Sequence, residues 1–97
     1  MLDRDTVLEV LLRCKDRFAE RYGITTPGIF GSVARGVAFD GSDVDVVVGM
    51  RKPNLFTLVH VKEELEEALQ RQVDIVHYRE RMNAFLKQRI DREAIYV

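Results

Sequence analysis

The segment at residues 43–49 constrains the fold most strongly, because it joins two aspartates to a run of branched apolar residues, DVDVVVG. Such runs favour β-strands. Side chains alternate between the two faces of a strand, so Asp43 and Asp45 project from one face near its start. The valines at 44, 46 and 48 fill the opposite face. The segment therefore predicts a strand with one apolar face and two carboxylates on the other.

Helices and strands alternate along the rest of the chain. Apolar residues at steps of three and four (Val7, Leu11, Cys14, Phe18) predict a first helix at 4–22, which Asp3 or Asp5 caps and Gly23 ends. We expect further helices at 55–71 and 80–93, a helical turn at 31–36, a turn at Asp40–Ser42, and strands at 29–30, 43–49 and 72–78. This order predicts a layered α/β (α+β) domain with a small mixed sheet.

Length and charge exclude several classes of protein. The 97 residues are enough for one domain, expected to span 1–97, but not for a catalytic domain plus a separate acceptor-binding domain. The net charge of −1 argues against direct binding of long nucleic acid. Cys14 is the lone cysteine, which is typical of a reducing, cytoplasmic compartment. A charged N-terminus and the lack of a long apolar run predict neither a signal peptide nor membrane association.

Two further features carry potential chemistry. Gly31-Ser32 follows a strand and leads into a helical turn, a place where backbone N–H groups and a hydroxyl bind phosphate, although this signal alone is weak. Asp74 is a charge within the apolar strand QVDIVHY. If that strand lies beside residues 43–49, Asp74 completes a cluster with Asp43 and Asp45.

Each aspartate also has an ordinary structural interpretation: Asp43 as a turn cap, Asp45 as a solvent-facing residue and Asp74 as the partner of an arginine. The joint pattern favours a metal site. Two carboxylates 4 Å apart repel by about 4 kcal/mol at an effective dielectric near 20, a cost that a divalent cation removes. Carboxylate oxygens are the ligands that Mg²⁺ prefers, with substrate phosphates completing its shell.

The order GSVARG, SDVDVVV, VDIV resembles the minimal nucleotidyltransferases of the DNA polymerase β superfamily, over nearly the whole chain. The resemblance implies Mg²⁺ ligation and catalysis by Asp43, Asp45 and Asp74, and nucleotide binding by four residues: Gly31, Ser32, Arg35 and Ser42. For Arg35 a phosphate contact, a pairing with the acidic cluster and a structural salt bridge all stay open. Phe39 and the Gln70-Arg71-Gln72 turn depart from the family's usual pattern without touching these motifs.

The resemblance also implies a function. Free-standing minimal domains of this family act as antitoxins that transfer AMP from ATP to a tyrosine hydroxyl of a HEPN-domain toxin encoded nearby. A hetero-oligomer with that toxin is therefore expected. Two alternatives remain: an antitoxin that neutralises its partner by contact alone, and a domain that regulates another enzyme.

Other polar residues fit simpler interpretations. His60 and His77 are lone histidines, and the glutamates between 63 and 67 form a solvated helix face. The basic residues between 79 and 92 fit solvated charge better than a partner surface, although the second interpretation stays open.

Overall fold

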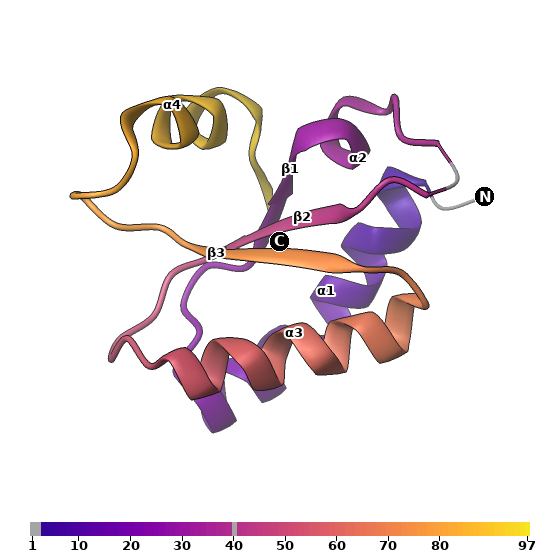
Figure 1. Cartoon of the computed structure of the whole chain (residues 1–97). Coiled ribbons are helices and arrows are strands. Elements are labelled where there is room, and N and C mark those ends of the chain that lie inside the picture. The colour runs from indigo at the N-terminus through magenta and orange to yellow at the C-terminus, as the bar shows by residue number, and fades with distance from the viewer. Residues whose placement is uncertain (1–2, 40) are drawn as a thin grey trace.

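A computed structural model describes residues 3–39 and 41–97 (Figure 1). Asp40, the first residue of the predicted turn, lies outside the described residues. The elements follow in the order α1 (Arg4–Tyr22), β1 (Gly28–Phe30), α2 (Gly31–Arg35), β2 (Val44–Val48), α3 (Leu55–Leu69), β3 (Val73–His77), α4 (Ala84–Glu93) and β4 (Ile95–Tyr96). The mixed α/β class predicted from the sequence is confirmed.

The strands form one mixed sheet in the order β3-β2-β1-β4. β1 pairs antiparallel with β2 and with β4, whereas β2 and β3 run parallel. The register places Asp45 of β2 between Phe30 of β1 and Asp74 of β3. Among the described residues, β3 is an edge strand, with β2 as its one neighbour in the sheet.

One face of the sheet packs against α1 and α3 (Figure 1). It buries the even-numbered valines of β2, Val44, Val46 and Val48, which alternate with the carboxylates, beneath apolar residues of both helices. The fully buried side chains of this core include Leu11, Phe18, Ile29, Val46 and Leu65. At roughly 1.5–3 kcal/mol per buried side chain, this face supplies most of the hydrophobic stabilisation.

The opposite face packs against α4 and has a smaller core. Phe30, Val47 and Ile90 are its buried members, and partly buried residues such as Leu86 surround them. This face therefore leaves part of the sheet uncovered by apolar side chains.

The helix ends explain where the boundaries differ from the prediction. Asp3 caps α1 through the Thr6 N–H, and Gly23 ends it with a left-handed conformation, both as predicted. α3 ends at Leu69 because Gln70 adopts a positive φ of 55°, a role usually filled by glycine. α4 begins only at Ala84, because the Asn83 side chain accepts the Leu86 N–H and caps it there.

The sequence prediction missed one strand. β4 has only two residues, too few to show an alternating pattern, and it is fixed by its pairing of Tyr96 with Gly28 and Ile95 with Ile29. Within residues 3–39 and 41–97, none of the helices is long and apolar enough to cross a membrane.

Candidate active site

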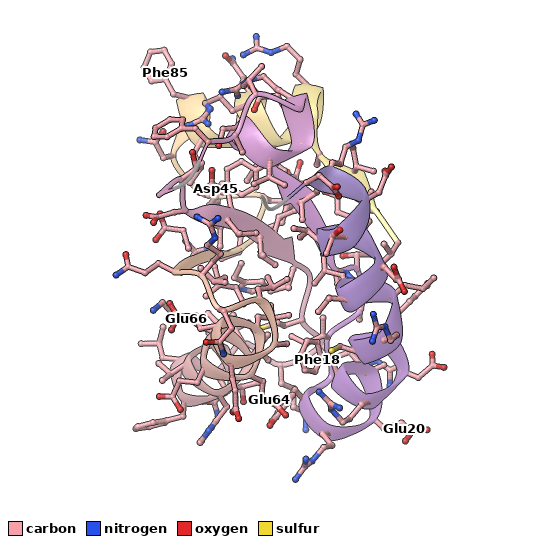
Figure 2. The ribbon with its side chains drawn as sticks, turned by 90° about the vertical axis from the view of Figure 1, so that its right-hand side faces the viewer. Phe18, Glu20, Asp45, Glu64, Glu66 and Phe85 are labelled. Atoms are coloured by element: carbon pink, nitrogen blue, oxygen red, sulfur yellow. The ribbon has the colours of Figure 1, made fainter. Side chains whose placement is uncertain are left out.

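Asp45 lies at the centre of the candidate site. Its place in β2 alternates with the buried Val44 and Val46, so its side chain leaves the sheet on the α4 side. Figure 2 shows it on the same side of the molecule as the ribbons of α2 and α4, whereas Glu64 and Glu66 lie on α3 below. Asp45 is half-buried, and Asp74 is its direct neighbour across the parallel pair.

The three predicted carboxylates act on one another electrostatically. Burial raises the pKa of Asp45, and the charges of Asp74 and Asp43 raise it further. Arg89 and Arg35 oppose this shift. Asp43 and Asp74 are both exposed. The structure therefore brings together the aspartates that the sequence singled out, with Asp45 as their most buried member.

The donor chemistry of these residues fits Mg²⁺, although they do not form a complete cage. In the part of the chain that the structure describes, no three carboxylate, imidazole or thiol residues are grouped closely enough to hold a metal ion by themselves. Mg²⁺ is usually held by one or two carboxylates together with waters and substrate phosphates. Asp45 and a neighbouring aspartate satisfy that requirement, and their mutual repulsion is the kind that a cation relieves.

Gly31 is required where β1 turns into α2. Its φ of +75° lies in the left-handed region, and a Cβ there would collide with the Asp45 carboxylate. The backbone of the Gly31-Ser32 turn thus lies directly against the half-buried carboxylate. Ser32 is half-buried in the first turn of α2. This close approach joins the predicted phosphate-binding turn to the acidic cluster.

Glu93, the last residue of α4, is a member of this region that the sequence prediction missed. Its Oε1 accepts the Gly31 N–H at 3.1 Å and the Arg35 guanidinium at 2.9 Å. The Glu93 side chain is only 12% exposed, and Arg89 lies 4.0 Å from the same oxygen. Arg35 therefore forms a salt bridge between α2 and α4, and the Gly31 amide is occupied by a protein carboxylate.

No local signal reveals this contact, because Glu93 lies 62 residues from Gly31 and 58 from Arg35. Ser42 has a local partner instead. Its Oγ accepts the Phe39 N–H at 3.1 Å, and its own N–H donates to the Phe39 carbonyl at 2.9 Å. Ser42 thus closes the turn before β2. The nucleotide-binding roles of Ser32, Ser42 and Arg35 stay predictions.

The two histidines lie on different elements, His60 on α3 and His77 on β3, three residues after Asp74. His60 stacks on Tyr22, with ring centroids 6.5 Å apart, between α3 and α1. Burial and the nearby Arg79 lower the pKa of His77 at the end of β3.

Comparisons with known proteins agree with this geometry. The family model described as "Polymerase beta, Nucleotidyltransferase" matches residues 13–97. A relative from Thermococcus cleftensis, "Protein adenylyltransferase MntA", is 33% identical over 98 residues, which cover 100% of this chain and 98% of the relative.

Solved structures that share the fold include the following two. One, assigned as a minimal nucleotidyltransferase, is 34% identical, has a TM-score of 0.77, and covers 97% of this chain and 95% of its own. The other is a complex of a tri-AMPylated HEPN toxin with an MNT antitoxin from Shewanella oneidensis. It is 17% identical with a TM-score of 0.69, covers 96% of this chain and 70% of its own, and shows the fold alone.

Proposed function

Because this chain belongs to the polymerase beta nucleotidyltransferase family, we propose that it is an antitoxin that transfers AMP from ATP to a tyrosine hydroxyl of a HEPN-domain toxin. The observation that carries the proposal is the register of β2 and β3. It pairs Asp45 with Asp74 while the Gly31 turn lies against Asp45. The name of the Thermococcus relative supports a protein acceptor, and the AMPylated toxin in the Shewanella complex supports the HEPN partner.

The reaction joins the acceptor oxygen to the α-phosphorus of ATP. As that bond forms, the bond from the α-phosphorus to the bridging oxygen breaks, pyrophosphate leaves, and the hydroxyl proton is released to a carboxylate or to water. Asp43, Asp45 and Asp74 would hold Mg²⁺, which supplies charge neutralisation at the phosphates. The protein's own contribution is positioning and charge stabilisation.

Each residue has a proposed task in that scheme. Asp45, the most buried carboxylate, is oriented by the glycine turn beside it. Asp74 lies exposed on the edge strand, the side from which an acceptor carried by another protein can approach. Gly31, Ser32, Arg35 and Ser42 are proposed to bind the nucleotide. Since Glu93 already accepts from Gly31 and Arg35, we propose that this contact rearranges or that phosphate binds at neighbouring groups.

A non-catalytic antitoxin is the main alternative. It would bind the toxin without turnover, and the aspartates would then be dispensable. The surroundings of Asp45 argue against this alternative. A half-buried carboxylate beside two others lowers stability, and such a residue is typical of a functional site.

Transfer of radiolabel tests the proposal. The chain is incubated with Mg²⁺, with ATP labelled at the α-phosphate, and with the purified product of the neighbouring gene. We expect label on a tyrosine of that product, reduced about 100-fold or more in Asp43→Asn and in Asp45→Asn. Tight binding of the two proteins without any label transfer would establish the contact-only alternative.

Thermal melting tests nucleotide binding separately. Ligand at 100 times its Kd adds about 2.7 kcal/mol to stability. For a domain of this size, the Tm then rises by about 10–20 °C. We expect this shift with Mg²⁺ and ATP together, and a smaller one with either alone.

A further inference from the structure

A groove that the catalytic scheme does not use follows the end of the edge strand. It has a volume of about 550 Å³ and lies between the beginning of α3, the end of β3 and the beginning of α4. These three segments face one another on the left of Figure 1. Apolar side chains form most of its lining: Leu55, Leu58, Ile75, Val76, Met82 and Leu86.

Large apolar side chains are exposed around this groove. Leu55, which lines it, is 78% exposed, and its neighbour Phe56 is 79% exposed. Phe85, next to the lining residue Leu86, is 80% exposed and points away from the body of the molecule in Figure 2. An apolar groove with large exposed apolar side chains on the same elements is typical of a site that another protein covers.

The charge around the groove is positive. Arg79 lines the groove, Lys52 immediately precedes its lining residue Pro53, and Arg81 immediately precedes its lining residue Met82. Glu80 is the one acidic residue in the segments 51–58 and 75–86, and its carboxylate contacts Lys87 at 3.4 Å. The whole chain has a net charge of −1, so this positive rim is local. A partner with acidic residues beside an apolar segment is complementary to it.

The groove lies close to the candidate active site along β3. Asp74 is the second residue of β3, and Val76, two residues further along the same strand, lines the groove. Two residues of a strand span about 7 Å. A protein seated in the groove is therefore held beside the carboxylate at the free edge of the sheet.

We propose that this groove is the docking site for the acceptor protein, and that it binds an apolar segment of that protein flanked by Asp or Glu residues. This inference rests on the proposed function, since it assigns the surface that holds the acceptor. A second copy of this chain is a poorer occupant. A two-fold contact would bring each positive rim against its own copy, and like charges in contact disfavour association.

Binding variants test the docking site. Leu55→Glu places a carboxylate in the first turn of α3, where the helix dipole favours negative charge, so the fold is retained. Leu12→Glu is the matched control, because Leu12 is an exposed apolar residue of α1, 59% exposed. Affinity for the purified product of the neighbouring gene is measured by calorimetry without ATP. We expect at least a tenfold loss for Leu55→Glu and less than a twofold change for Leu12→Glu.

Charge is tested in the same assay. Arg79→Glu reverses a charge in the groove, and Arg13→Glu reverses one on the solvent side of α1. We expect Arg79→Glu to bind more weakly than wild type and Arg13→Glu to bind as wild type does. The difference in affinity between Arg79→Glu and wild type should shrink as the salt concentration rises. Equal affinities for the groove variants and their controls would overturn the docking site.

Two further measurements separate the remaining outcomes. Label transfer is recorded on the same preparations, so binding that depends on Leu55 without any transfer contradicts the proposed function and leaves the docking site standing. Sedimentation of the chain alone tests self-association. A wild-type dimer that Leu55→Glu dissociates would overturn the proposal in favour of a second copy. Displacement of the partner by single-stranded RNA at the groove would overturn it in favour of nucleic acid.

Discussion

The sheet face beneath α1 and α3 and the face beneath α4 are made by alternate residues of the same strands, yet they bury different things. The first face joins the even-numbered valines of β2 to a continuous apolar core. The second has three buried apolar residues, Phe30, Val47 and Ile90. Phe30 is paired directly with Asp45, whose neighbour on β3 is Asp74. The first face therefore contributes mainly to stability, and the second carries the residues of the candidate active site.

Two carboxylates on opposite sides of the sheet, Glu66 of α3 and Asp45 of β2, have pKa values shifted in opposite directions. On α3, Glu66 accepts the Val73 N–H at 3.0 Å and the Lys62 ammonium at 3.2 Å, and these contacts lower its pKa. On β2, burial and neighbouring aspartates raise the pKa of Asp45. Carboxylates with partners stabilise a fold, and carboxylates among like charges are retained where a substrate or cation meets them.

The largest expected effect compares the two cores. Leu65 of α3 and Ile90 of α4 are both fully buried. Leu65→Ala opens a cavity inside the larger core and should lower the free energy of unfolding by about 3–5 kcal/mol, whereas Ile90→Ala lies in a small cluster that collapses more easily and should cost about 2–3 kcal/mol. Urea denaturation measures both, and equal costs would contradict the division between the faces.

The second prediction isolates the contact between the glycine turn and Asp45. Gly31 and Gly36 share a positive φ, but only at Gly31 would a Cβ meet another group. Gly36→Ala should cost about 1–2 kcal/mol for the left-handed conformation alone. Gly31→Ala should cost about 1–3 kcal/mol more. That excess should disappear in an Asp45→Gly background, and its persistence there would show that Asp45 is not the obstacle.

The third prediction concerns Glu93, which joins α4 to the turn. Glu93→Ala removes hydrogen bonds to Gly31 and Arg35 and should cost about 1–3 kcal/mol. Glu9→Ala is the control, because its pair with Arg13 is exposed and is worth about 0–1 kcal/mol. Thermal melting measures the loss of stability in both variants. Equally small losses would show that the contacts of Glu93 contribute no more than an exposed ion pair.

The smallest effects are pH-dependent and opposite in sign. The lowered pKa of Glu66 contributes stability above the unfolded value of 4.5 that is lost as the pH falls through the folded pKa. Glu66→Gln should therefore melt below wild type at neutral pH and approach it in acid. The raised pKa of Asp45 contributes stability only below the unfolded value of 3.8 and loses it as the pH rises. Asp45→Asn should melt increasingly above wild type toward neutral pH, in the absence of metal.

Sequence patterns predicted the elements whose signals are local. The stripe through Leu11 and Phe18, with Asp3 and Gly23 at its ends, gave α1 its observed bounds. The alternation around Asp45 and the apolar run around Asp74 placed both carboxylates on strands, and the structure confirms that these strands are neighbours.

The features that the sequence could not predict depend on distant partners. β4 has two residues and exists through its pairing with β1. In the sequence, Glu93 resembles a solvated helix residue. Its contact with Arg35 arises only because α4 packs beside α2. Gln70 takes a left-handed conformation that its residue type does not favour. For β4 and Glu93, tertiary packing and not local propensity determines the outcome.

Melting and label transfer of Asp45→Asn, recorded together, show whether Asp45 is retained for chemistry at a cost in stability. We expect this variant to melt above wild type at neutral pH without metal, because the amide removes the repulsion from Asp74 and Asp43. We also expect the transfer of labelled AMP to the partner protein to be lost. A variant that melts below wild type and still transfers label at the wild-type rate would contradict the placement of Asp45 in a catalytic site.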